Sequence, residues 1–165
     1  LLLSVGLIPE NELTRGAGIC MDGITGGASV DQYRQTSLKG VFACGNVLHV
    51  HDLVDFVSEE AALAGNAAAA YIKGNAPAKE IALAVKPAGK VRYTVPQRID
   101  SAKEEVTLFF RVGSVADNAL LTVKCGDKVL LTKKKRRMTP GEMESVRLSP
   151  ALLSEADGEL TVCVE

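Results

Sequence analysis

The chain has 165 residues, of which 47% are hydrophobic, and its formal net charge at pH 7 is −1. This length is enough for one or two domains with a buried core. The near-zero charge excludes nucleic-acid binding driven by bulk electrostatics, and the sequence holds no apolar run near the length of a membrane span. We therefore expect no nucleic-acid partner and no membrane span.

The four cysteines are scattered along the sequence and form no C-x-x-C pair. This pattern favours neither a disulfide framework nor a zinc knuckle. A reduced cysteine inside a protein behaves as a small hydrophobic residue. We expect reduced, structural thiols and a cytoplasmic location; the residues concerned are Cys20, Cys44, Cys125 and Cys163.

The first residues, LLLSVGLIP, predict a buried strand over residues 1–5, followed by a turn. They include neither an initiator Met nor the basic leader of a signal peptide, so we interpret the chain as a fragment of a longer protein. Two short strands are expected at residues 18–21 and 28–31, because the glycines of the intervening DGITGG segment suit a hairpin turn.

Residues 36–72 predict a turn, a buried strand over residues 41–44, and a long helix that ends before Gly74. Asp52 is the expected N-cap of the helix. Gly45 lets a ligand approach the backbone, and the free N–H groups of a helix N-terminus favour an anion or a carbonyl oxygen. The apolar spacing places one buried helix face at Leu53, Val57, Ala61, Ala64 and Ala68.

After a linker at residues 75–78 the hydrophobic pattern changes from helical to alternating. Residues 1–75 carry 4 basic and 8 acidic side chains, whereas residues 76–165 carry 15 and 12. We therefore predict two domains, over residues 1–75 and 76–165. The second should be a small β-sandwich, immunoglobulin- or fibronectin-like in outline, with a helical turn at residues 150–155. Its strands are expected at residues 81–85, 91–95, 106–112, 120–124, 129–133, 144–148 and 160–164, with a tight hairpin at residues 125–128.

The segment TSLKGVFACGN at residues 36–46 resembles the second flavin-binding motif of the FAD-dependent pyridine nucleotide–disulfide oxidoreductase superfamily, T-x-x-x-G-h-h-A-x-G-D, where h is hydrophobic. The LLLSVGLIP segment is similar to the stretch where family members return from the nicotinamide domain to the flavin domain. The resemblance covers residues 1–73 and is strongest to the branch found alongside glycerol-3-phosphate-dehydrogenase-like flavoproteins. It implies an α/β fragment of an FAD-binding Rossmann-like domain, followed by the small all-β sandwich.

The resemblance also implies a site. In this family the acidic residue that ends the motif bonds the ribitol chain of FAD, and the following helix N-terminus faces the pyrimidine edge of the flavin. Asn46 occupies the acidic position here; its amide can bond a hydroxyl but carries no charge. No catalytic residue and no metal ligand is predicted. The implied cofactor-binding residues are Gly45, Asn46, Val47, His51, Val54 and Asp55.

The family implies a parent enzyme that is an FAD-dependent, NAD(P)-linked oxidoreductase, with the nicotinamide bound by a domain absent from this chain. Its expected partners are the nicotinamide cofactor, an unidentified electron donor or acceptor, and a flavoprotein subunit. Because the chain has no G-x-G-x-x-G segment, we expect it to be inactive alone and able to self-associate. The alternative is a non-enzymatic flavoprotein remnant whose sandwich binds a protein partner.

Three features keep more than one interpretation. His49 and His51 form an H-x-H pair that could bind a metal, but with no third ligand nearby in sequence they are more simply side chains that line the isoalloxazine or lie on the surface. Asn46 is either a flavin ligand or a turn residue. The KKKRR run at residues 133–137 is either a docking surface for an anionic partner or a solvated hairpin tip between two strands.

Overall fold

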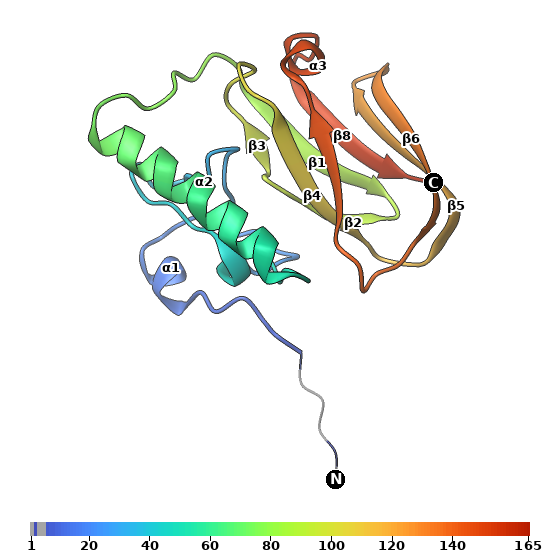
Figure 1. Ribbon diagram of the computed structural model, residues 1–165, viewed down its shortest axis with the longest axis horizontal. Coiled ribbons are helices and arrows are strands. Elements are labelled where there is room, and N and C mark those ends of the chain that lie inside the picture. Colours follow the sequence, from blue (N-terminus) through green and yellow to red (C-terminus); the bar gives the residue numbers. More distant parts are fainter. Residues whose placement is uncertain (1, 3–5) are drawn as a thin grey trace.

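The computed structural model describes residue 2 and residues 6–165 and shows a mixed α/β chain with two β-sheets and few helices. Figure 1 shows helix α2 (Val54–Ile72) and the short helix α1 (Glu12–Gly16) on one side of the molecule and the strands on the other. None of the helices in the described part of the chain has both the length and the apolar character needed to span a lipid bilayer.

The larger sheet has five strands in the order β3-β1-β8-β5-β6. All its neighbours pair antiparallel except β1 and β8, which run parallel with Val85 opposite Leu160. Strands β5 and β6 are joined by a two-residue loop, since Cys125 pairs with Lys128, and this confirms the predicted hairpin. The bounds are β1 Leu83–Gly89, β3 Arg98–Ile99, β5 Ala116–Cys125, β6 Lys128–Met138 and β8 Glu159–Val164.

The smaller sheet has three antiparallel strands, β2 (Val91–Val95), β4 (Val106–Val112) and β7 (Glu144–Leu148). Helix α3 (Pro150–Ser154) follows β7 and begins at Ser149, whose side chain accepts a hydrogen bond from the backbone N–H of Leu152. A serine N-cap followed by proline is a strong helix start. The predicted helical turn is therefore confirmed.

One hydrophobic core is shared by both sheets. Leu108 and Phe110 of β4 are fully buried in it, together with Val162 of β8 and Leu153 of α3. The alternation of buried and exposed residues along β7 is the pattern of a strand with one face on a core. All seven strands expected after residue 80 are present, but β1, β5, β6 and β8 have other bounds than expected, and the two-residue strand β3 was not predicted.

The three-stranded sheet is covered on its other face as well. Tyr93 and Val95 of β2 pack in a second buried cluster with Ile19, Val30 and Leu48, which come from the loops before α2. The loop backbone also pairs with the β2–β3 turn: Gln97 N donates to Val30 O at 3.1 Å. The sheet thus lies between the shared core and the N-terminal segment, and the division into domains at residues 75/76 stays a prediction.

Several expected elements of the N-terminal segment are wrong. Residues 18–21, 28–31 and 41–44 form no strands; they contribute only the isolated bridges Met21–Ala28 and Gln35–Phe42. Short apolar runs become strands only where neighbours complete a ladder of hydrogen bonds, and the described residues supply none here. The expected strand at residues 1–5 falls, apart from Leu2, outside the described residues.

Helix α2 ends as predicted, with Gly74 at a φ of +73° just after it, but begins differently. Its N-cap is Leu53, which offers no side-chain hydrogen bond. The expected buried face is also partly wrong, because Leu53 and Ala61 are exposed, whereas Glu60 and Ala64 are buried. The face that is buried instead carries Phe56, Glu60 and Ala64, and Phe56 packs against Phe109 of β4.

The KKKRR run is not a hairpin tip. Residues 133–137 lie within β6, at the edge of the five-stranded sheet, and all five side chains are exposed. Lys135 pairs with Glu144 at 2.6 Å and Arg137 with Asp117 at 3.3 Å. Charged side chains on an edge strand oppose pairing with another chain, which gives the run a structural role.

Candidate functional site

The most polar buried cluster of the described chain surrounds Glu60, on the inner side of α2. Phe56, one helical turn earlier, packs edge-on against Phe109 of β4 with ring centroids 5.8 Å apart. Residues four apart lie on the same helix face, so this contact turns Glu60 toward the interior as well. The side chain of Glu60 is only 1% exposed.

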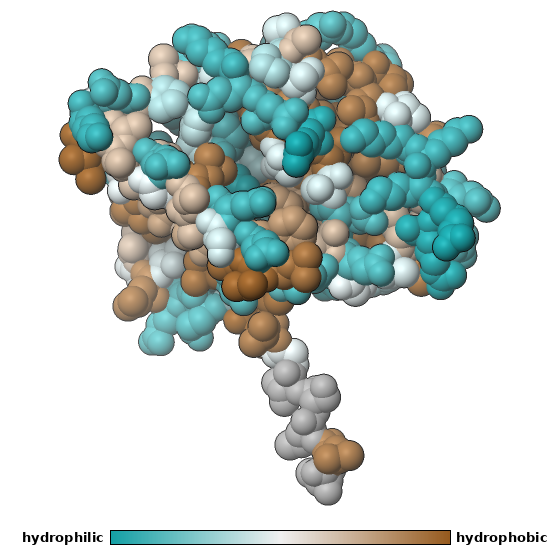
Figure 2. All heavy atoms as spheres, viewed as in Figure 1, coloured by the Kyte–Doolittle hydropathy of each residue, from teal (hydrophilic) through white to brown (hydrophobic). Residues whose placement is uncertain are grey.

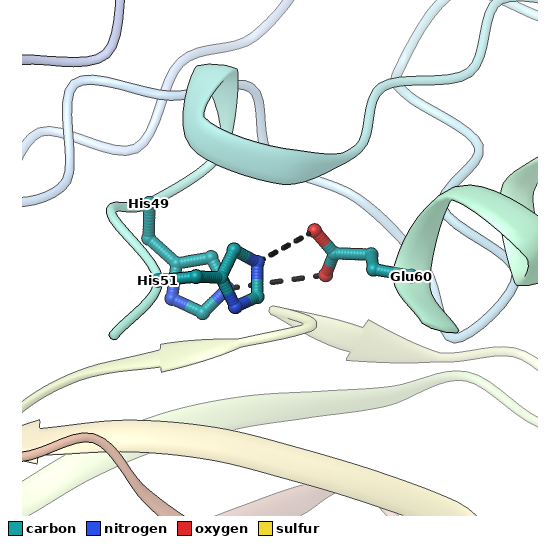
Figure 3. A group of neighbouring side chains, drawn as sticks. All are labelled: His49, His51 and Glu60. Carbon is teal, nitrogen blue, oxygen red and sulfur yellow. Dashed lines mark hydrogen bonds and ion pairs between the residues drawn. The ribbon is translucent and has the colours of Figure 1, made fainter. Parts of the chain in front are cut away.

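Two histidines from the loop before α2 face this carboxylate (Figure 3). His51 Nε2 lies 3.0 Å from Glu60 Oε2, and His49 Nε2 lies 3.9 Å from Glu60 Oε1. The two rings are tilted against each other with centroids 4.4 Å apart, and both contact the ring of Phe109. Since the side chains of both histidines are at most 1% exposed, the sequence-based option of surface exposure is wrong for both.

Two further groups hold the carboxylate of Glu60. Arg34 Nε donates to Oε1 at 2.7 Å, and the backbone N–H of Gly45 donates to Oε2 at 2.6 Å. Arg34 has a φ of +68°, which is uncommon for a residue with a side chain. The turn that imposes it is held by Asp31, whose carboxylate accepts from the N–H groups of Tyr33 and Gln35.

Close backbone packing positions the histidine loop. A Cβ atom on Gly27 would lie 2.0 Å from the carbonyl oxygen of Leu48, so only glycine allows this contact. Asn11 ties the same loops together, because its Nδ2 donates to Val47 O at 2.7 Å and to Gly26 O at 3.1 Å. The loop that carries His49 and His51 is therefore fixed from both sides.

The cluster shifts two pKa values downward. Burial alone would raise the pKa of Glu60, but the nearby imidazole of His49, the hydrogen bond with His51 and the charge of Arg34 hold it well below its usual range. Burial lowers the pKa of His49, and Glu60 offsets only part of this effect. Glu60 is therefore ionised and His49 neutral at pH 7.

Two buried imidazole nitrogens find no hydrogen-bond partner among the described residues, His49 Nε2 and His51 Nδ1. His49 Nδ1 is 3.4 Å from the hydroxyl of Tyr93. Buried polar groups are usually paired, so an imidazole nitrogen without a partner invites an explanation. Together with Glu60, the two histidines place three potential ligand atoms within 4.8 Å of one another.

The residues expected to bind flavin divide into two groups. Asn46, Val47, Val54 and Asp55 are exposed around the short helix η1 (Gly45–Val47) and the start of α2. Gly45 is buried at a φ of +72°, and its N–H is bound to Glu60. The imidazole of His51 points into the interior rather than to this surface. Its backbone N–H donates to Asn46 Oδ1 at 3.2 Å.

Sequence reasoning missed Glu60 and Arg34, the two residues that complete the cluster. The only available signal for Glu60 was its position one turn after Phe56 on the helix. For Arg34, no local pattern in the sequence indicates a buried guanidinium. The fold therefore brings a third potential ligand, Glu60, to the H-x-H pair that had none nearby in sequence.

Comparison of the chain with protein-family models, with curated proteins and with solved structures gives no match in any of the three.

Proposed function

We propose that this chain supplies the ribityl and isoalloxazine half of the flavin site in an FAD-dependent, NAD(P)-linked oxidoreductase. The chain would be the C-terminal part of that enzyme, with the pyrophosphate and nicotinamide bound by segments that precede it. The family motif at residues 36–46 leads directly into the surface that this proposal requires.

One observation carries the proposal: the N-terminus of α2 is exposed, has no side-chain cap and carries three exposed apolar side chains beside the carboxylates of Asp52 and Asp55. The N-cap Leu53 makes no side-chain hydrogen bond to the first turn, which leaves N–H groups for an outside acceptor. Val47, Leu53 and Val54 are 37%, 56% and 75% exposed. Figure 2 shows apolar surface at the lower centre of the molecule, in the region where α2 begins in Figure 1. The isoalloxazine ring of a flavin is largely apolar and has carbonyl oxygens along one edge, so it suits such a surface.

Asn46 fits the role of a ribityl ligand. Its Oδ1 already accepts from His51 N, and no described residue accepts from its Nδ2. The side chain is exposed beside the helix start, so Nδ2 can donate to a hydroxyl. The flavin itself supplies the redox chemistry, and these residues would orient it.

The two sheets around one core support a β-sandwich, immunoglobulin- or fibronectin-like in outline, as the finer description of residues 76–165. The four free cysteines support a reducing compartment such as the cytoplasm. The sandwich would then be an appendix to the flavin domain, with a flavoprotein subunit as a candidate partner.

The test is the visible spectrum of the full-length parent protein, purified without added flavin. Bound flavin gives two absorbance bands in the visible and near-ultraviolet range, and the flavin released by acid should be stoichiometric and identified as FAD by chromatography. A parent that is colourless after purification, and stays so after incubation with FAD, would refute the proposal and favour a non-enzymatic remnant.

A further inference from the structure

We propose that His49, His51 and Glu60 form a binding site for a divalent transition-metal ion, with zinc as the best match. This inference goes beyond the proposed flavin site and does not depend on it. The three potential ligand atoms lie within 4.8 Å of one another, and all three side chains are buried. Two imidazoles and one carboxylate are a ligand set that zinc uses in proteins, with a fourth position left open.

The ligand separations are close to those of a coordinated ion. Metal–ligand bonds of about 2.0–2.1 Å at tetrahedral angles place two ligand atoms roughly 3.3–3.4 Å apart. His51 Nε2 and His49 Nε2 lie 3.0 Å and 3.9 Å from the nearest oxygens of Glu60, on either side of that value. Shifts of about half an ångström would bring each imidazole to this separation from its nearest carboxylate oxygen. The remaining separations are within 4.8 Å, so they require adjustments of at most about 1.5 Å.

The hydrogen bonding of His49 favours coordination. Its Nδ1 is within reach of the Tyr93 hydroxyl, as expected for a metal ligand whose second nitrogen is held by an outer partner. Its Nε2 is buried, points toward Glu60 and has no hydrogen-bond partner among the described residues, because 3.9 Å is too long for a hydrogen bond. An ion between the two groups would satisfy both.

Arg34 defines the competing interpretation. Its ion pair with Glu60 already compensates the buried carboxylate, so the cluster is electrically balanced without a metal. A bound divalent ion would add two positive charges beside Arg34, and an anion such as hydroxide in the fourth position would offset part of this charge. The ion-pair network alone, however, leaves His49 Nε2 without a partner, and this is the nitrogen that faces Glu60.

Two cavities border the cluster. Glu60 lines a cavity of about 270 Å³ between α2 and the three-stranded sheet, together with Phe56 and Phe109. His49 lines a second cavity, together with Tyr93. The cavities thus reach two of the three ligand residues, and an ion would enter by displacing the side chains that cover the ligand atoms.

The chain offers an unusually clean test because it contains only two histidines. The full 165-residue chain, produced without a histidine tag and stripped with EDTA, is titrated with zinc while the imidazole ¹⁵N signals are followed by NMR. We expect one zinc per chain and a coordination shift at one nitrogen of each histidine. Imidazole signals that stay unchanged at saturating zinc would overturn the proposal, even if zinc bound elsewhere.

Variants separate this site from binding by thiols. His49→Gln should weaken zinc binding by at least about 100-fold, since loss of an outer partner alone costs 10–100-fold. Cys44→Ser is the matched control, because Cys44 belongs to the same segment but not to the ligand group. The affinity of this variant for zinc should stay within about threefold of that of the unmodified chain. Zinc binding that survives His49→Gln and disappears in Cys44→Ser would overturn the proposal. Should His49→Gln not fold, the NMR titration of the unmodified chain decides.

Discussion

The carboxylate of Asp52 joins the start of helix α2 to the three-stranded sheet through Arg111 of β4, 59 residues further along the chain. Its second oxygen accepts from the backbone N–H of Met143 at 2.6 Å. Arg111 also donates to Val50 O at 3.0 Å and to Gly141 O at 2.7 Å. The residue expected to cap the helix is therefore used to fasten the helix to the sheet.

Replacing this carboxylate should loosen the contact between the two parts of the chain. We expect Asp52→Ala to lower the free energy of unfolding by about 1 kcal/mol, the scale of a partly exposed ion pair with one further hydrogen bond. Urea unfolding measures the change, and a double-mutant cycle with Arg111→Ala isolates the pair. Glu59→Ala, at an exposed position of α2, is the control and should change stability by less than about 0.5 kcal/mol. Equal effects of Asp52→Ala and Glu59→Ala would contradict the prediction.

The sequence predicted the β part of the fold well, because each strand is indicated by hydrophobic residues and turn residues that are close together in the sequence. Strands 91–95, 106–112 and 144–148 are confirmed at both ends. Each is a short run rich in β-branched and aromatic residues or alternating in polarity, which is a local signal. The N-terminal segment was predicted poorly. Its apolar runs need partner strands that the described residues do not provide, and its loops pack instead on Tyr93 and Val95.

The candidate metal site shows the same limit. The H-x-H pair is visible in sequence, whereas Glu60 and Arg34 reach it only through tertiary structure. Arg34 is 26 residues from Glu60 in the chain, and Glu60 lies at the edge of the helix face that the apolar spacing predicted to be buried. The periodicity of apolar residues predicts which helix face is buried only where that face is apolar. It gives no sign of a charged residue such as Glu60 that is buried in an ion pair.

Limited proteolysis should cut the chain between residues 75 and 79. These residues are exposed and belong to no helix or strand. We expect a resistant fragment of residues 76–165 with a β-type circular dichroism spectrum, because the core shared by the two sheets lies entirely within it. It should unfold at lower urea than the full chain, since separation exposes Tyr93 and Phe109. A helical or unfolded fragment would show that the boundary is wrong.

Asp31 should make the stability of the chain depend on pH in a specific direction. Burial raises the pKa of Asp31, and the hydrogen bonds from the Gln35 and Tyr33 N–H groups and the charge of Arg98 reverse only part of this. A carboxyl whose pKa is higher in the folded state stabilises the fold below its unfolded pKa of about 3.9, and this stability is lost as pH rises through the folded pKa.

Asp31→Asn removes this titration while keeping an oxygen that can accept the same two backbone hydrogen bonds. The stability of the variant relative to the unmodified chain should therefore increase from pH 4 to pH 7. Urea unfolding at intermediate pH values measures the difference, with Asp127→Asn in the exposed β5–β6 hairpin as the matched control. A difference that is constant, or that falls with rising pH, would contradict the assignment.

Asn46→Ala in the full-length parent should weaken FAD binding about fivefold to tenfold, because a hydrogen bond to a ribityl hydroxyl is worth on the order of 1 kcal/mol. Asn46→Asp should be tolerated, since the related family has Asp at this position. Equilibrium binding to the flavin-free parent gives the affinities. Asn75→Ala is the control, because it removes an asparagine side chain from the exposed segment after α2, away from the proposed flavin site. If Asn46→Ala binds FAD as tightly as this control, Asn46 does not belong to the site.

The 165-residue chain itself should be purified colourless and free of FAD. In the proposed site, flavin affinity is shared between this surface and a glycine-rich turn that the chain does not contain. The surface at Asn46 and the start of α2 offers two or three hydrogen bonds of roughly 1 kcal/mol each. The loss of translational and rotational freedom on binding costs about 4 kcal/mol or more, so the dissociation constant should exceed the millimolar range. Acid precipitation followed by flavin fluorescence of the supernatant measures the content. Stoichiometric flavin there would mean that this surface alone holds most of the binding energy.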